Sequence, residues 1–185
     1  MITDIIKDAR EHMDKSIGAL GHEFGGVRTG RASAGLFEKV TVEAYGSTMP
    51  LNQVASIKVP EPQMVVIEPW DKTVIGAIER GIQASDLGLN PSNDGQVIRV
   101  PFPALTEERR RELVKLCKHY AEEAKVACRN IRRDANHKLE RFEQGGECSE
   151  DDFRRAETEV QKLTDSHIAQ IDEMLKRKEA EIMEV

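Results

Sequence analysis

The longest helical pattern in this sequence begins after Thr106 and ends at the glycine pair Gly145-Gly146. Thr106 followed by Glu107 and Glu108 is typical of a helix N-terminus, and no Gly or Pro interrupts the stretch. A helix of about 40 residues at 1.5 Å each extends over about 60 Å. A helix of that length cannot bury its apolar side in a small globular core. The chain must therefore provide other long helices to cover it.

Two further segments carry apolar residues at steps of three and four, which is the period of one helix face. The first extends over residues 2–27, and Gly30 is placed to end it. The second begins at Ser149, with Asp152 three positions later as in a capping box, and continues almost to the C-terminus. Aromatic residues make up only 4% of the chain, which suits narrow apolar seams better than a deep catalytic pocket. The sequence therefore predicts a bundle of three helices.

The segment between the first two helical patterns has a different period. Val40, Val42 and Ala44 alternate with polar residues, and residues 45–47 are typical of a turn. Residues 31–105 as a whole are therefore expected to form a small, strand-rich α/β domain. Its further elements are short β-rich runs at 55–59, 64–68 and 97–100, and one amphipathic helix at 73–85.

The inserted domain joins the helices through two short segments rich in Gly and Pro, residues 29–32 and 101–105. Paired linkers of this kind favour a hinge, although a fixed junction that simply ends two elements explains them equally well. The predicted fold class is α+β. An antiparallel three-helix bundle from residues 1–30 and 106–185 carries the inserted domain of residues 31–105.

Charge is unevenly distributed along the chain. The formal net charge of −6 at pH 7 argues against a generally basic nucleic-acid binder. Residues 107–146, however, contain 11 Lys and Arg against 8 Asp and Glu, whereas residues 147–185 contain 6 against 12. A contact with a polyanion would therefore use the middle helix, with the acidic third helix turned away from it.

A helical wheel separates the side chains of the middle helix into two faces. The expected core face holds Leu113, Cys117, Tyr120, Ala124, Ala127, Ile131 and Phe142. The opposite side, the cationic face, holds Arg111, Lys115, Lys118, Lys125, Arg129, Arg132 and Arg133, with Arg110 at its edge. Such a face can be an ordinary solvated surface. An anion-binding surface is favoured because few acidic residues interrupt the cations and because guanidinium groups suit bidentate phosphate contacts.

The sequence contains no recognisable catalytic or metal-binding constellation. Residues 25–32 match a phosphate-binding loop only in spacing, because Arg31 and Ala32 stand where a Lys and a hydroxyl are required. The five histidines and three cysteines lack metal-ligand spacing, and we expect structural thiols. No apolar run is long enough to span a membrane, and the acidic N-terminus is unlike a targeting peptide. We therefore expect a cytoplasmic protein without a cofactor, a metal or an enzymatic activity of its own.

Five separated stretches, in order, make the chain resemble the ribosome recycling factor family over essentially its whole length. These stretches are Val27-Arg28-Thr29-Gly30-Arg31-Ala32, Ser85-Asp86-Leu87-Gly88-Leu89-Asn90-Pro91, Ile98-Arg99-Val100-Pro101, Leu105-Thr106-Glu107-Glu108-Arg109-Arg110 and Arg129-Asn130-Ile131-Arg132-Arg133-Asp134-Ala135-Asn136. The resemblance implies a roughly L-shaped monomer that acts after translation termination. It would split ribosomes into subunits together with elongation factor G, and that partner would hydrolyse the GTP.

The resemblance also implies roles for particular residues. The helical bundle would contact RNA of the large ribosomal subunit, and the inserted domain would swing about the linkers and meet elongation factor G. Carried over by motif, the RNA-contacting residues would be Arg110, Arg129, Arg132 and Arg133, with Arg132 the foremost. Lys118 and Lys125 are added from the helical wheel alone. The hinge would consist of Gly30, Arg31, Ala104 and Leu105.

Two other readings of the sequence stay open at this point. In the first, the protein is a non-ribosomal helical adaptor whose cationic face meets an acidic partner. In the second, it is an enzyme that works through the inserted domain. Sedimentation distinguishes a translation factor from an adaptor. A translation factor should co-sediment with large subunits and lose binding steeply with salt, whereas an adaptor should not bind ribosomes.

Overall fold

The computed structural model describes residues 1–27 and 29–184. Arg28, a member of the first motif, and Val185 lie outside the described residues. The chain divides into two compact units: residues 1–27 with 110–185, which we call unit 1, and residues 28–109, which we call unit 2. Unit 1 is helical and unit 2 contains all the strands among the described residues, so the predicted α+β class is confirmed.

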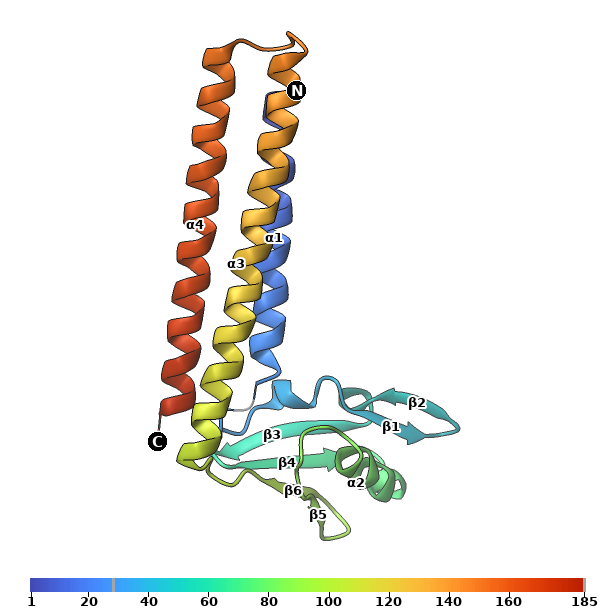
Figure 1. Ribbon diagram of the computed structural model, residues 1–185. Helices are drawn as coiled ribbons and strands as arrows, with labels where there is room; N and C mark the ends of the chain where they lie inside the picture. Colours follow the sequence, from blue (N-terminus) through green and yellow to red (C-terminus); the bar gives the residue numbers. More distant parts are fainter. Residues whose placement is uncertain (28, 185) are drawn as a thin grey trace. The chain divides into compact units, whose positions relative to one another are not determined.

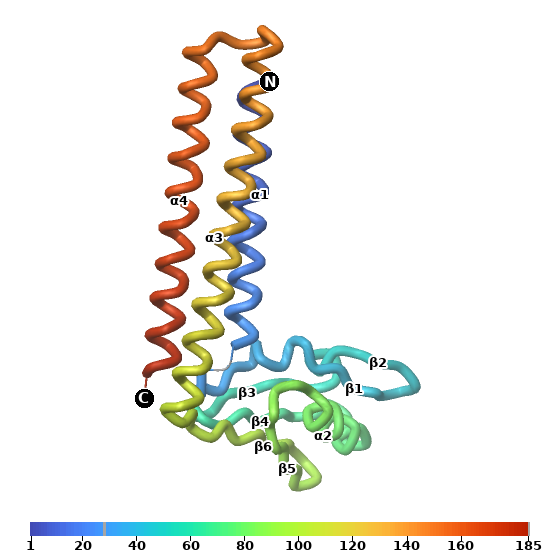
Figure 2. The backbone as a smooth tube through the Cα atoms, in the orientation of Figure 1, coloured from blue at the N-terminus to red at the C-terminus, as the bar shows by residue number. Residues whose placement is uncertain are grey.

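Unit 1 is built from three long helices, α1, α3 and α4. They span Ile2–Gly25, Glu107–Gln144 and Glu150–Met183. Figures 1 and 2 show α3 antiparallel to both α1 and α4. The predicted N-caps are present, because Thr106 Oγ1 accepts from Arg109 N and Ser149 Oγ accepts from Asp152 N, both at 3.1 Å. The first helix ends at Gly25 and not at Gly30, since the glycine pair at 25–26 stops it earlier than the apolar pattern predicted.

Most buried residues of unit 1 recur at intervals of eleven along each helix. In α3 they form the two series Leu113, Ala124, Ala135 and Cys117, Cys128, Leu139. In α4 the series is Val160, Ile171, Ile182, and in α1 it is Ala9 with Leu20 and Met13 with Phe24. Eleven residues in three turns give about 3.67 residues per turn, close to the 3.6 of a straight helix. The helices can therefore stay in contact along their length with little supercoiling.

The backbones of α1 and α4 approach each other more closely than those of the other helix pairs in unit 1. A small residue lies at this contact, since a Cβ at Gly21 of α1 would lie 3.7 Å from Met174 Cε of α4. Because α1 and α4 lie close together, a polar side chain of one helix can reach the other. The buried His167 does so from α4.

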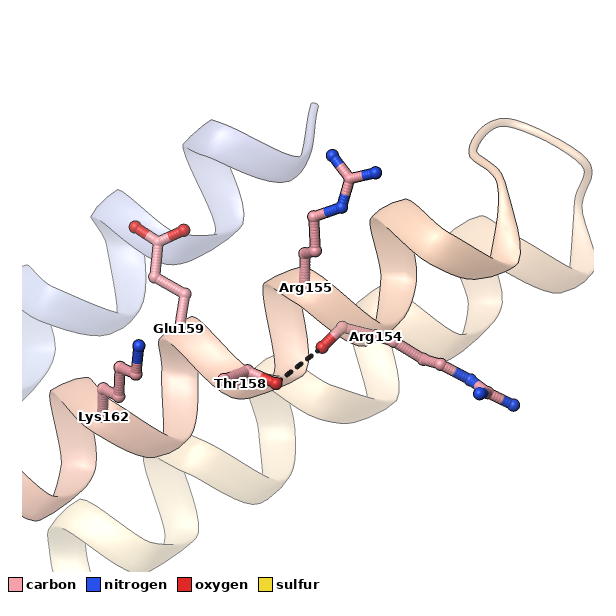
Figure 3. Close-up of a pocket in the computed structure, with 5 residues that line it drawn as sticks. All are labelled: Arg154, Arg155, Thr158, Glu159 and Lys162. Carbon is pink, nitrogen blue, oxygen red and sulfur yellow. Dashed lines mark hydrogen bonds between the residues drawn. The ribbon is translucent and has the colours of Figure 1, made fainter.

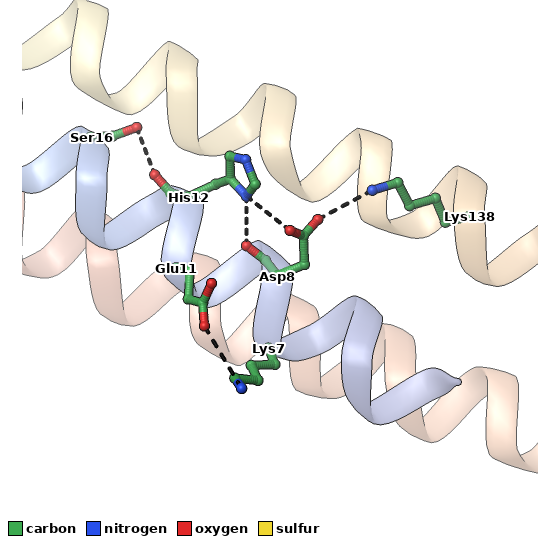
Figure 4. A network of polar contacts seen from close by, with 6 residues as sticks. All are labelled: Lys7, Asp8, Glu11, His12, Ser16 and Lys138. Atoms are coloured by element: carbon green, nitrogen blue, oxygen red, sulfur yellow. Dashed lines mark hydrogen bonds and ion pairs between the residues drawn. The ribbon is translucent and has the colours of Figure 1, made fainter.

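His167 links α4 to α1 through its ring. Its side chain is 8% exposed, its Nδ1 lies 2.7 Å from Leu163 O, and its Nε2 lies 2.7 Å from Asp14 Oδ1. Each ring nitrogen of the buried ring therefore faces an oxygen acceptor, a backbone carbonyl on α4 and a carboxylate on α1. A second polar link on α1 is exposed: Asp8 Oδ2 lies 3.2 Å from Lys138 Nζ of α3, within the network drawn in Figure 4.

These two aspartates provide a matched pair of substitutions on one helix. Asp14→Ala removes the carboxylate that faces a buried ring nitrogen of His167, so we expect it to lower the free energy of unfolding by about 1–3 kcal/mol. Asp8→Ala removes an exposed ion pair, for which about 0–1 kcal/mol is expected. Urea unfolding followed by circular dichroism at 222 nm measures both. Equal losses in the two variants would show that burial of His167 does not decide the result.

The described residues of unit 2 form two antiparallel sheets and one α-helix that lies wholly within the unit. The strands are β1 (Thr41–Ala44), β2 (Ser47–Pro50), β3 (Ala55–Glu61), β4 (Met64–Pro69), β5 (Ser92–Asn93) and β6 (Ile98–Pro101), and the helix is α2 (Ile75–Gln83). β1 and β2 form a hairpin, while the larger sheet has the order β3-β4-β6-β5. Three 3-10 turns at Ala34–Phe37, Leu51–Gln53 and Lys72–Val74 complete the unit. The predicted helix at 73–85 is thus split into a 3-10 turn and α2.

The core of unit 2 lies between its sheet residues and α2. Ile67 and Ile98 from the sheet and Ile78 and Ile82 from α2 are fully buried. α2 also packs directly on the backbone of β1, where a Cβ at Gly81 would lie only 2.6 Å from Thr41 O. A glycine is therefore required at the point where this helix and strand meet.

Candidate nucleic-acid interface on α3

The buried side chains of α3 differ in part from those that the wheel predicted. The expected core residues Tyr120, Ala127, Ile131 and Phe142 are only half-buried, whereas Ala121, Cys128, Ala135 and Leu139 are buried. On the same wheel the buried face is centred about 40° closer to the predicted cationic face. The cations on the edge of the cationic face that is nearer to the buried residues therefore lie beside the helix–helix contact and not opposite it.

Two lysines of the cationic face contact acidic residues of α4. Lys125 Nζ lies 2.5 Å from Asp172 Oδ1, and the lysine side chain is only 19% exposed. Lys118 Nζ lies 3.8 Å from Glu179 Oε1 and stays largely exposed. The charge of Lys125 is thus compensated within unit 1, so this residue serves the contact between α3 and α4.

Arg132 also reaches α4, but it meets a neutral partner. The half-buried guanidinium group donates from Nη1 to Gln161 Oε1 at 3.3 Å. The amide nitrogen of Gln161 in turn donates to Asp165 Oδ1 at 2.8 Å. A neutral amide orients the guanidinium group without cancelling its charge, and it leaves the other N–H groups of the fork available to a ligand.

The remaining arginines of the predicted site are held along α3 itself or lie at its start. Arg129 Nη1 lies 3.2 Å from Glu122 Oε1, two turns earlier on the exposed surface. Arg133 is exposed and donates to Asn130 Oδ1 at 2.9 Å. Arg110 is half-buried, with no ion pair to another residue in the described part of the chain. The guanidinium groups of 129, 132 and 133 come from consecutive turns of one helix.

The predicted hinge residues belong to two segments that meet inside unit 2. Gly30 has a positive φ of 83°, and a Cβ at that position would lie 3.3 Å from Leu105 Cγ and 3.7 Å from Leu105 N. Arg31 and Ala104 beside them are exposed. The two linkers are thus in contact, and the left-handed backbone together with the close packing requires glycine at position 30.

A pocket of about 470 Å³ lies on the surface of unit 1 (Figure 3). It is lined by Arg154, Arg155, Thr158, Glu159 and Lys162. All five come from successive turns of α4, and the Thr158 hydroxyl donates to Arg154 O at 3.0 Å, as a hydroxyl within a helix commonly does. This depression is the space between side chains of one exposed helix surface and brings together no residues from separate elements.

No group of three or more His, Cys, Asp or Glu side chains among the described residues could hold a metal ion. Within the same part of the chain, no helix is both long and apolar enough to cross a membrane. Cys117 and Cys128 are buried and Cys148 is half-buried, and all three thiols are free. Burial raises the pKa of the Cys117 and Cys128 thiols.

The family model described as ribosome recycling factor matches residues 20–183 of the chain. The ribosome-recycling factor of Geobacillus thermodenitrificans is 59% identical over 185 residues, which cover 100% of both chains. That of Symbiobacterium thermophilum is 55% identical with the same coverage. The chain belongs to the ribosome recycling factor family.

Two solved structures are similar to the chain over its full length. A solution structure of the ribosome recycling factor has a TM-score of 0.81 and 46% identity, and it covers 100% of this chain and 98% of its own. The second has a TM-score of 0.66 and 45% identity, and it covers 100% of both chains. This second structure presents models for the T. thermophilus ribosome recycling factor and the E. coli elongation factor G bound to the E. coli post-termination complex.

Proposed function

We propose that this protein splits the post-termination ribosome into its subunits together with elongation factor G, so that the ribosome and its messenger RNA are released for reuse. The likeness over the full length to a factor described on the post-termination complex with elongation factor G carries this proposal. GTP hydrolysis belongs to the partner, and this chain acts in the cytoplasm as a monomeric translation factor and not as an enzyme.

Unit 1 grips RNA of the large ribosomal subunit through α3. Arg129, Arg132 and Arg133 supply guanidinium groups from consecutive turns, and Arg110 extends the contact toward the start of the helix. Lys118 adds an exposed charge. Lys125 contributes indirectly, because its ion pair with Asp172 holds α3 and α4 together. The acidic α4 faces away from the RNA, since phosphate groups would repel it.

Unit 2 moves relative to the RNA-bound helices when the partner pushes it. The hinge consists of Gly30, Arg31, Ala104 and Leu105, where the two linkers touch. The displaced domain then acts as a wedge between the ribosomal subunits. Binding and splitting are therefore separate steps, and each depends on a different part of the chain.

Sedimentation of post-termination ribosomes through a sucrose gradient tests the proposal. Ribosomes incubated with this protein, elongation factor G and GTP should yield free subunits, while omission of any of the three should leave them intact. Binding of the protein alone to large subunits should weaken with salt, with a log–log slope of about 0.7 to 0.9 per phosphate neutralised. Absence of ribosome binding at low salt would instead favour a non-ribosomal adaptor.

A reversible crosslink between the two linkers tests the hinge separately. A Gly30→Cys, Leu105→Cys variant, made with Cys148→Ser to remove the one accessible thiol, should bind ribosomes when oxidised but fail to split them. Dithiothreitol should restore splitting in the same sample, which controls for strain from a side chain at the positive φ of position 30. Splitting by the fully oxidised protein would show that movement at this junction is dispensable.

A further inference from the structure

Two large aromatic side chains of unit 2 are exposed. Trp70, which follows β4, is 67% exposed, and Tyr45, in the turn between β1 and β2, is 66% exposed. The Tyr45 hydroxyl donates to Asp71 Oδ2 at 2.6 Å, and Asp71 directly follows Trp70. The two side chains therefore belong to one small area, which we call the aromatic patch (Tyr45, Trp70 and Asp71).

The patch is held rigidly by hydrogen bonds. The Asp71 carboxylate also accepts from Thr73 N at 2.9 Å and from Thr73 Oγ1 at 2.7 Å, while Trp70 N donates to Val54 O at 3.2 Å. The bond from Tyr45 holds the pKa of Asp71 below its ordinary value and raises the pKa of the Tyr45 phenol. The Tyr45 ring and the backbone at Trp70 are thus held before binding, which reduces the conformational entropy lost on contact with a partner.

Tyr45 has a backbone conformation that is unfavourable for a bulky side chain. Its φ is 53° and that of Gly46 is 76°, as in the two-residue type I′ hairpin turn that Asn, Asp and Gly favour. Among the described residues other than glycine, Tyr45 alone has a positive φ. The chain thus places a bulky ring where the turn disfavours it, and the ring gains no burial in return. An unfavourable backbone conformation at Tyr45 that brings no gain in packing points to a role of this residue in binding.

The aromatic patch lies at the end of the larger sheet remote from both linkers. The linker segments attach at the turn between β3 and β4, because Ala32 N donates to Pro62 O at 2.7 Å and Phe102 N donates to Gln63 O at 2.8 Å. β4 runs from that end to the other and is followed by Trp70. Its length places the patch about 20 Å from the linkers. A force applied there has a long lever arm about the hinge.

The charge around the patch favours a protein partner over RNA. Residues 41–48 and 68–73 contain one basic residue, Lys72, and three acidic residues, Glu43, Glu68 and Asp71, of which Glu68 pairs with Lys58 Nζ at 2.8 Å. Surfaces that bind single-stranded RNA combine aromatic rings with a surplus of cations, which this area lacks. Exposed Trp and Tyr side chains are typical of the centres of protein–protein interfaces. A matching protein surface would offer an apolar pocket with a Lys or Arg beside it.

We propose that the aromatic patch is the docking surface through which elongation factor G pushes unit 2. This inference rests on the proposed function, because it assigns a contact site to the partner named there. An apolar pocket of the partner accommodates Trp70 and Tyr45, and a cationic side chain of the partner faces Glu43. The contact transmits force at the point of unit 2 where the force turns the unit most effectively.

The test uses the full-length protein with Tyr45→Asn and Trp70→Ala combined. Asn suits the positive φ of the turn, so the fold should persist, and thermal unfolding verifies it. Ribosome binding should be unchanged, while the concentration of elongation factor G that gives half-maximal splitting should rise about tenfold or more. Val59→Ala is the matched control, because Val59 is 41% exposed in the same unit but outside the patch, and it should change neither quantity.

Three outcomes would count against the proposal. An unchanged dependence on elongation factor G in the folded double variant, or in Trp70→Ala alone, would exclude the patch as its docking surface. A loss of ribosome binding would instead assign the patch to a contact with the ribosome itself. An equal effect of Val59→Ala would show that any exposed apolar residue of unit 2 serves. Failure of the unaltered protein to split ribosomes would refute the proposed function, which is a separate result.

Discussion

An Arg132→Ala variant is expected to leave post-termination ribosomes unsplit while its helix content and melting temperature stay close to those of the unaltered protein. The side chain donates one hydrogen bond to Gln161, and such a bond contributes only about 0.5–1.5 kcal/mol to folding. Its charge, in contrast, has no acidic partner in that contact. Loss of a charge-assisted contact to RNA should weaken binding to large subunits roughly tenfold to a hundredfold.

Two companion variants separate the possible causes of such a loss. Gln161→Ala removes the same hydrogen bond but keeps the guanidinium group, so it should retain most of the splitting activity. Arg132→Lys keeps the positive charge but lacks the planar fork, so an intermediate rate would indicate bidentate contact with phosphate. The measurements are co-sedimentation with large subunits and the yield of free subunits, with circular dichroism for the fold. Normal splitting by Arg132→Ala would remove this residue from the proposed interface.

The second large effect is expected in unit 2, where Gly81→Ala should destabilise the fold by about 3 kcal/mol or more. The added methyl group would lie 2.6 Å from the backbone oxygen of Thr41, and neither helix nor strand can yield without breaking the core between them. Gly76→Ala on the same helix is the matched control. Its methyl group would meet only the flexible Arg80 guanidinium at 3.5 Å, so unit 2 should keep or gain about 0.5–1 kcal/mol.

Protease digestion and amide hydrogen exchange would locate the damage in Gly81→Ala. Residues 28–109 should lose protection, while the three helices of unit 1 stay protected. Such a protein should still bind large subunits and yet fail to split them, because the moving part would be unfolded. If unit 2 of Gly81→Ala proved as stable as that of Gly76→Ala, the close approach of α2 to β1 would not require glycine at position 81.

The parts of the fold that depend on local chemistry were predictable from the sequence. Ser149 caps α4 through the very hydrogen bond that its spacing to Asp152 predicted. The split of charge between α3 and α4 likewise follows from counting. The buried face of α3 was partly wrong, because the wheel gave weight to large residues such as Tyr120 and Ile131. Small residues such as Ala121 are buried instead, and only the neighbouring helices determine which side of α3 is covered.

The candidate site shows the same limit. The arginines at 129, 132 and 133 could be identified from the motif in which they lie. Lys125 looked equivalent on the wheel, but its partner Asp172 lies on another helix, and nothing in the local sequence reveals the pairing. The aromatic patch was missed for a similar reason. Tyr45 looked like part of an ordinary turn, and the exposure of Trp70 depends on how unit 2 folds.

The eleven-residue recurrence of buried side chains has a consequence for how long this bundle can be. Eleven residues rise about 16.5 Å along a helix, and after that distance each of the three helices presents the same side to its neighbours again. Removing or adding one such layer from all three helices together would preserve their mutual packing, whereas a change of four or five residues would rotate one seam away from the others. Whole eleven-residue layers are therefore a natural unit in which the length of this bundle can change.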